Sequence, residues 1–169
     1  MTGEWSPDYM YNPDLPAQLQ QAAPGARVLV LLRDPVDRFI SGNTRGRRLA
    51  AEHGIHGAEA DIAARNTERG MYFEPVARAL EAFGRDRVLV LQYERCQSDY
   101  EGELRRTHGF LGLDPERGPA PPIRPPRARS ASEEERTRLG ELYAPDVRRL
   151  AGLVPDLEVE RWPNVADFL

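Results

Sequence analysis

The sequence of 169 residues contains no lysine, and all 23 of its basic residues are arginine. It has a single cysteine, Cys96, which excludes an intrachain disulfide and suits a reducing compartment, so we expect a cytoplasmic protein. No apolar run approaches the length of about 18 residues that a membrane span needs. The N-terminus also lacks a basic stretch followed by an apolar one, so we expect no signal peptide. The formal net charge of −4 argues against a nucleic-acid-binding protein, for which a basic domain is typical.

What the chain does contain fits a single globular unit covering residues 1–169. Apolar residues make up 40% of the chain and charged residues 30%, and the 15 prolines and 14 glycines predict many loops. Residues 114–129 are rich in proline and arginine. We interpret this segment as a loop that covers the domain, because the sequence after it is too short to fold alone.

The segment VLVLLRDPVDRFIS, from Val28 to Ser41, is the most informative part of the sequence. Its apolar run predicts a buried strand over 28–33, and Asp34 followed by a proline predicts the start of a helix over 35–50. Arg33 would then lie at the carboxyl edge of a sheet, where open α/β folds bind their ligands. An arginine fork beside the Ser41 hydroxyl suits a phosphate group.

The remaining patterns predict an α/β domain with parallel strands. We expect a short helix near 16–22, one short helix within an otherwise irregular stretch at 51–70, and a helix over 72–83. A buried strand over 88–93 and a helix over 98–111 should follow. The rest of the chain should form a helix that begins after Ser132, with Glu135 completing a capping box, a last helix near 145–153, and an extended tail with Trp162. The stretch 51–70 is a candidate for a lid on the acceptor side of a site.

These residues resemble the sulfotransferase family, whose members use 3′-phosphoadenosine 5′-phosphosulfate (PAPS) as the sulfuryl donor. The segment from Arg33 to Ser41 is similar to the family's 3′-phosphate-binding motif, and GEWSPDY at 3–9 is similar to its G-E-K-[ST]-P-x-Y segment. Residues 70–72 with 88–94 resemble its second strand with a Y-E pair, and 110–113 with the helix after Ser132 resemble its closing section. The resemblance covers most of the chain, in the right order.

The resemblance implies a P-loop-NTPase-like parallel sheet flanked by helices, and transfer of a sulfuryl group to a hydroxyl or amine of a small-molecule or carbohydrate acceptor. It implies PAPS as co-substrate and no metal. Arg33 and Ser41 would hold the 3′-phosphate, Tyr93 would lie by the adenine or order the site, and Arg127 would reach the 3′-phosphate from the covering loop. Weak candidates for the catalytic centre are Glu4 and Ser6.

The chain also departs from the family pattern. A strand and a loop with glycine and lysine precede the G-E-K segment in the family, whereas here Met1 stands two residues before Gly3, and Trp5 replaces the lysine. We therefore expect an N-terminally truncated domain that lacks the first strand and the phosphosulfate loop and is weak or inactive as an enzyme by itself. An incomplete sheet would leave an open edge, so we expect an upstream segment or a homodimer to complete it.

Two other functions remain open at this stage. One is a non-catalytic remnant that binds adenosine 3′,5′-bisphosphate or a protein partner, and the other is a nucleotide-kinase-like α/β protein. Arg33 could also be an ordinary strand-end arginine paired with Asp37, and Tyr93 could simply pack in the core. His53 and His56 are interpreted as exposed loop residues because no third metal ligand lies near them in the sequence.

Overall fold

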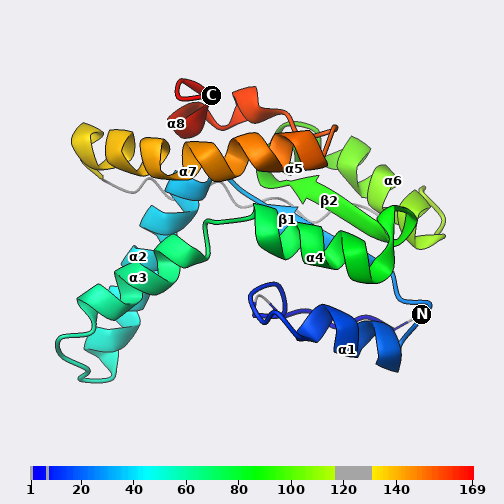
Figure 1. The fold of residues 1–169 in the computed structure, drawn as a ribbon, viewed down its shortest axis with the longest axis horizontal. Helices are drawn as coiled ribbons and strands as arrows, with labels where there is room; N and C mark the ends of the chain where they lie inside the picture. Colours follow the sequence, from blue (N-terminus) through cyan, green and yellow to red (C-terminus); the bar gives the residue numbers. More distant parts are fainter. Residues whose placement is uncertain (1, 7, 117–130) are drawn as a thin grey trace.

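Two parallel strands form the sheet of the part of the chain that the computed structural model describes, residues 2–6, 8–116 and 131–169 (Figure 1). The strands are β1 (Val28–Leu32) and β2 (Val88–Gln92), with Val28 opposite Val88 and Leu32 opposite Gln92. A parallel pair needs a long crossover. Here it comprises α2 (Pro35–Glu52), α3 (Glu59–Glu68), α4 (Phe73–Phe83) and the 3-10 turn η1 (Arg85–Arg87). The α/β class and the parallel sheet predicted from sequence are confirmed.

The other elements precede and follow this unit. They are α1 (Leu15–Ala22), α5 (Tyr93–Ser98), α6 (Tyr100–Leu111), α7 (Glu133–Leu153), the 3-10 turn η2 (Val159–Arg161) and α8 (Pro163–Ala166). Helix α4 packs against both strands and lies between α1 and α7, while α5 and α6 pack beside β2 (Figure 1). The two packed layers bury a single core between them.

The core draws apolar side chains from both strands and from four helices. Its buried members are Val30 and Leu32 of β1, Val88 of β2, Val36, Phe39 and Ile40 of α2, Tyr72, Val76 and Phe83 at α4, Leu139, Tyr143, Ala144, Val147 and Leu150 of α7, and Trp162 and Val165 at α8. The stripe on α2 was predicted from its helical spacing and is confirmed.

Only one face of β1 belongs to this core. Leu29 and Leu31 alternate with the buried positions and are 41% and 57% exposed. The prediction of a strand buried on both faces is therefore wrong for β1. The prediction was based on the continuous apolar run of the strand. Within the described residues, however, α4 covers one face of β1, and no helix makes a comparable contact with the other face.

Helices α2 and α3 form a hairpin that projects from the body of the molecule (Figure 1). Their close approach depends on glycine: a Cβ at Gly42 would lie 2.2 Å from Oδ1 of Asn66, and one at Gly46 would lie 2.6 Å from Cγ2 of Ile62. Asn66 donates through Nδ2 to Oδ1 of Asn43 at 2.7 Å, so the two buried amides pair with each other. The expected loop with one short helix at 51–70 is confirmed, the helix being α3.

Helix α7 begins as predicted, since the Ser132 hydroxyl accepts a hydrogen bond from the backbone N–H of Glu135 at 3.1 Å. The two separate helices expected here are wrong, because α7 runs unbroken through Pro145 to Leu153. Proline removes one helical hydrogen bond. The buried stripe that continues on both sides, including Tyr143 and Val147, holds the helix together across that position.

Three further boundaries differ from expectation. The strand run predicted to reach Tyr93 ends at Gln92, where α5 begins. The helix predicted over 98–111 is α6, which begins two residues later because Asp99 caps it by accepting from the N–H of Gly102 at 3.0 Å. The expected extended tail contains η2 and α8 instead. None of the helices in the described ranges is both long and apolar enough to cross a membrane.

Candidate functional site

The turn between β1 and α2 is the centre of the candidate site. Asp34 is buried, and its Oδ1 accepts hydrogen bonds from the backbone N–H groups of Val36 at 2.9 Å and Asp37 at 3.1 Å, as expected for a helix cap. Pro35 occupies the first helical position. The cap fixes where the helix starts, and so it fixes Arg33, the residue between the strand and the cap, at the carboxyl edge of the sheet.

Arg33, at the edge of the sheet, makes one long ion pair and one contact with an aromatic ring. Its NH2 lies 3.5 Å from Oδ2 of Asp37, and its guanidinium lies over the ring of Tyr93, 5.1 Å from the centroid. Its Nε is buried and has no hydrogen-bond partner among the described residues. The ordinary strand-end pairing with Asp37 is thus present but long, and it leaves an N–H of the fork free. A buried charged donor without a partner is costly, so the geometry fits an anion that would complete it.

Ser41 lies on α2 one helical turn beyond Asp37, so the two share a face of the helix. Its side chain is half-buried, and no hydrogen bond of its hydroxyl is found within the described ranges. Arg38, also on α2, instead donates to the carbonyl of Asn66 at 3.3 Å, and Arg45 and Arg48 are exposed. Within the described residues the Ser41 hydroxyl therefore has no partner, whereas Arg45 and Arg48 face solvent.

The backbone around Arg33 is held by hydrogen bonds from distant segments. The hydroxyl of Tyr72 donates to the carbonyl of Arg33 at 2.9 Å, and the N–H of Asp34 donates to Oε1 of Glu94 at 2.9 Å. Glu94 accepts a second bond from Nε1 of Trp162 at 2.8 Å. Both carboxylate oxygens of Glu94 are thus used to join the start of α5, the turn after β1, and the C-terminal segment.

The C-terminal segment also contacts the capping residue directly. Oδ2 of Asp34 accepts from Nδ2 of Asn164 at 2.9 Å and from its backbone N–H at 3.3 Å. The rings of Tyr72 and Trp162 lie 6.0 Å apart and are tilted by 52°. The turn that presents Arg33 is therefore held by side chains from distant parts of the chain.

Burial raises the pKa values of the two carboxyl groups in this network. For Asp34 the desolvation is partly offset by hydrogen bonds from Asn164 and from the N–H of Asp37. For Glu94 it is partly offset by the bonds from the Asp34 N–H and from Trp162. In both cases the folded protein binds the proton more tightly than the unfolded chain does.

We therefore expect the free energy of unfolding to fall as the pH rises from about 4 through the folded-state pKa values of these groups. The stability that the protons provide is complete below the unfolded pKa and is lost above the folded one. Urea unfolding at intervals from about pH 4 to 7 measures this. Asp34→Asn removes one titrating group, so the stability difference, wild type minus variant, should decrease over that interval. A difference that increases would contradict the assignment.

Three residues of this network were not recognised from the sequence as site residues: Tyr72, Trp162 and Asn164. Each acts through a contact with a residue far away in the chain, and the tryptophan–proline pair at 162 was the only local signal. Glu94 was recognised as part of a pair with Tyr93 that could order the site. The structure places Tyr93 at the start of α5, where its hydroxyl accepts from Nε2 of Gln97 at 3.1 Å.

The N-terminal candidates are not joined to this turn. Glu4 is exposed, and the Ser6 hydroxyl accepts from the N–H of Asp8 at 3.3 Å. Asp8 pairs with Arg69 at the end of α3, and the hydroxyl of Tyr11 donates to the Arg69 carbonyl at 2.7 Å. Within the described residues, no hydrogen bond or ion pair links Glu4 or Ser6 to Arg33. The candidate Arg127 lies outside those residues.

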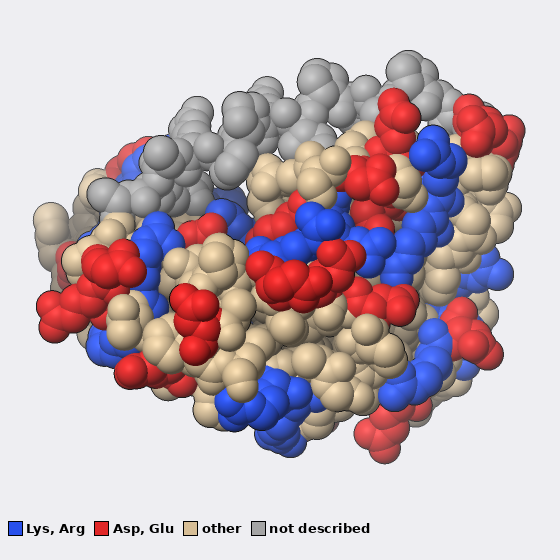
Figure 2. Space-filling model, turned by 90° about the horizontal axis from the view of Figure 1, so that it is seen from above, with Lys and Arg blue, Asp and Glu red and all other residues tan. Residues whose placement is uncertain are grey.

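The face of the molecule seen in Figure 2 carries no broad field of one sign. Arginines and acidic residues are interspersed over the face seen in Figure 2. Across the described ranges no group of three histidine, cysteine, aspartate or glutamate side chains could hold a metal ion. An anion would be bound here by a few placed donors rather than by a basic surface.

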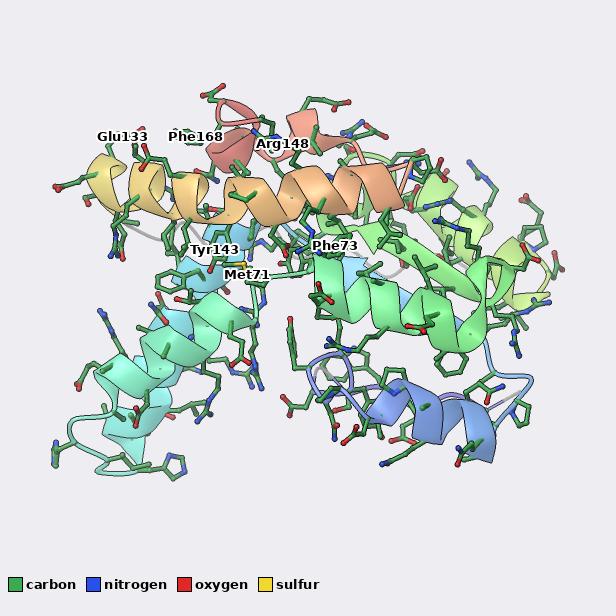
Figure 3. The ribbon with its side chains drawn as sticks, viewed as in Figure 1. Met71, Phe73, Glu133, Tyr143, Arg148 and Phe168 are labelled. Carbon is green, nitrogen blue, oxygen red and sulfur yellow. The ribbon has the colours of Figure 1, made fainter. Side chains whose placement is uncertain are left out.

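A concave region lies between the α2–α3 hairpin and α7. A groove of about 510 Å³ lies between them. It is lined by Phe39, Ala63, Ala64, Thr67, Arg138, Leu139, Glu141 and Leu142. Tyr143 of α7 points toward the end of α3 and donates to the carbonyl of Thr67 at 3.3 Å (Figure 3). The stretch expected as a lid thus forms one wall of a groove, fixed to α7 at its base.

The sequence is similar to proteins of one known family. A family model described as "Sulfotransferase domain" matches residues 11–125. Heparan sulfate glucosamine 3-O-sulfotransferase 6 of Mus musculus is 31% identical over 123 residues, which cover 67% of this chain and 35% of the relative. Heparan sulfate glucosamine 3-O-sulfotransferase 3B1 of Mus musculus is 30% identical over 124 residues, 67% of this chain and 31% of the relative.

A solved structure agrees with these sequence matches. The crystal structure of a sulfotransferase from Alicyclobacillus acidocaldarius superposes with a TM-score of 0.73 at 25% identity, over 91% of this chain and 65% of that one. The chain spans about a third of the length of the curated relatives it matches. The family model covers well over half of the chain, and the resemblance inferred from the motifs is confirmed: the chain belongs to the sulfotransferase family.

Proposed function

We propose that this chain supplies the nucleotide-anchoring part of an enzyme that transfers a sulfuryl group from PAPS to a hydroxyl or amine. The observation that carries the proposal is the Arg33 guanidinium, which lies at the carboxyl edge of the sheet with a buried Nε that has no partner among the described residues. The family membership supports the choice of PAPS over other anions. When bound, PAPS supplies the sulfuryl group that is transferred.

In this proposal the residues of the chain bind and orient. Arg33 holds the 3′-phosphate by charge-assisted hydrogen bonds, and the Ser41 hydroxyl donates a further one. The Tyr93 ring supports the guanidinium from one side. Arg127 is included by resemblance only, as are Glu4 and Ser6 near the transferring group. Because the chain has no lysine to stabilise the charge that develops on the departing 5′-phosphate, transfer by this chain alone is expected to be slow.

The acceptor class proposed is a carbohydrate. The names of the relatives specify a heparan sulfate glucosamine acceptor, and this supports a carbohydrate as the acceptor class rather than that particular sugar. A cytoplasmic location and an assembly that completes the sheet, by a homodimer or an upstream segment, remain proposals from the single cysteine and the two-stranded sheet of the described region.

Calorimetric titration with adenosine 3′,5′-bisphosphate tests the proposed site. Arg33→Ala should weaken binding by about 10- to 100-fold, the effect of removing a hydrogen bond to a charged group. Adenosine 5′-monophosphate should bind the wild type more weakly than the bisphosphate, and Arg33→Ala should affect its binding little.

Arg45→Ala is the matched control, since Arg45 lies on the same helix, is exposed, and makes no ion pair within the described ranges. It should bind the bisphosphate as the wild type does. A folded wild type that binds the bisphosphate no more tightly than the monophosphate would refute the proposal.

A further inference from the structure

The carboxylate of Asp37 lies between two arginines that come from opposite ends of the chain. Its Oδ2 is 3.5 Å from NH2 of Arg33, and its Oδ1 is 3.1 Å from NH1 of Arg136. The same NH1 of Arg136 donates to Oδ1 of Asn164 at 2.9 Å. The shorter contact is with Arg136, so this arginine is the principal counter-ion of Asp37.

Arg136 lies in an unfavourable place for a cation. It follows three glutamates, at 133–135, near the N-terminus of α7 and so close to the positive end of the helix dipole. It does not make an ion pair with any of them among the described residues, and it reaches instead across 99 positions of sequence to Asp37. Arg136 is unfavourable for the helix dipole at this position but makes a specific long-range contact, which indicates that its role lies outside the helix.

We propose that Arg136 is a positioning residue for the 3′-phosphate site. By holding and neutralising the Asp37 carboxylate, it leaves the Arg33 fork free for a phosphate. This inference rests on the proposed function. Without Arg136, Arg33 would be the cation that still pairs with this carboxylate among the described residues. The carboxylate would then compete with the phosphate for that guanidinium and would also repel the incoming anion.

The charge balance of the site gives the inference a sharp test. Arg136→Gln keeps a polar side chain with an amide donor but removes the charge opposite Asp37. We expect it to weaken binding of adenosine 3′,5′-bisphosphate about tenfold, as measured by calorimetry, because the freed carboxylate is a charged competitor for Arg33. Adding Asp37→Asn to this variant removes the competing charge and should restore the affinity to within about threefold of the wild type.

Arg148→Ala provides the matched control. Arg148 also lies on α7 and also ties down the C-terminal segment, by donating to the carbonyls of Phe168 at 3.0 Å and Leu169 at 3.2 Å (Figure 3). It has no contact with Asp37 in the described ranges. Its loss should lower stability in urea without changing the affinity for the bisphosphate.

The outcomes separate this inference from the function on which it rests. A wild type that does not bind the bisphosphate overturns both. Binding that depends on Arg33 but is unchanged in Arg136→Gln overturns the inference alone. The inference is also overturned if Arg136→Gln binds weakly and the added Asp37→Asn does not restore binding, since Arg136 would then act only by supporting Asn164.

Discussion

Replacing Trp162 by alanine is expected to lower the free energy of unfolding by about 3–5 kcal/mol, the range for removal of a large aromatic side chain from a core. Trp162 is fully buried, packs near Tyr72, and donates from Nε1 to Glu94 at 2.8 Å. The truncation therefore removes apolar contacts and also leaves a half-buried carboxylate oxygen without its donor. Urea unfolding followed by circular dichroism measures the loss.

The chain contains its own control for this experiment. Trp5, the other tryptophan, is 86% exposed, so Trp5→Ala should change the unfolding free energy by no more than about 0.5 kcal/mol. In the variants that remain folded, Trp162→Ala should also weaken binding of adenosine 3′,5′-bisphosphate, because Glu94 supports the N–H of Asp34 beside Arg33. If Trp162→Ala and Trp5→Ala had equal unfolding free energies, Trp162 would not hold the C-terminal segment in place.

The second large effect is expected at Gly140, in the middle of α7. A Cβ there would lie 2.2 Å from the backbone oxygen of Asn164 and 2.6 Å from Cε2 of Phe168, which lies over the helix (Figure 3). Because the nearest atom belongs to the backbone, a side-chain rotation cannot relieve the collision. Gly140→Ala should therefore displace α8, at a cost of about 1–3 kcal/mol in unfolding free energy, and loosen the contact between Asn164 and Asp34.

Gly152, on the same helix, has no atom within 4 Å of the corresponding position. Gly152→Ala should stabilise the protein by about 0.5–1 kcal/mol, because alanine loses less conformational freedom in a helix than glycine. Thermal or urea unfolding of the two variants gives the comparison. If both alanines raised the stability, α8 would have to pack on α7 less tightly than the structure indicates.

The sequence was most informative where the structure depends on neighbouring residues. The β1–α2 turn, with the cap at Asp34 and Arg33 beside it, was predicted from a run of residues adjacent in the chain, and so were α4 and the start of α7. Each of these depends on capping or periodicity, which a short window contains. The placement of Arg33 at the edge of the sheet followed from them.

The residues that support the site could not be predicted in this way. Tyr72, Trp162 and Arg136 act on the turn through contacts with sequence separations between 39 and 99 residues. No local pattern specifies these contacts. The continuity of α7 was missed for a related reason, since the proline at 145 is a strong local signal against a helix and the packing of α7 that outweighs it is tertiary. The exposure of Leu29 and Leu31 likewise depends on which helices cover the sheet.

The bond between Asp34 and Asn164 has a consequence for how the protein is made. These residues are 130 positions apart, so the turn that presents Arg33 leaves the ribosome well before one of its supports does. Contacts of such long sequence separation slow folding, because chain closure must precede the gain in energy. The nucleotide site should thus be completed only after residue 164 has left the ribosome, and a nascent chain stalled before residue 162 should fail to retain the bisphosphate.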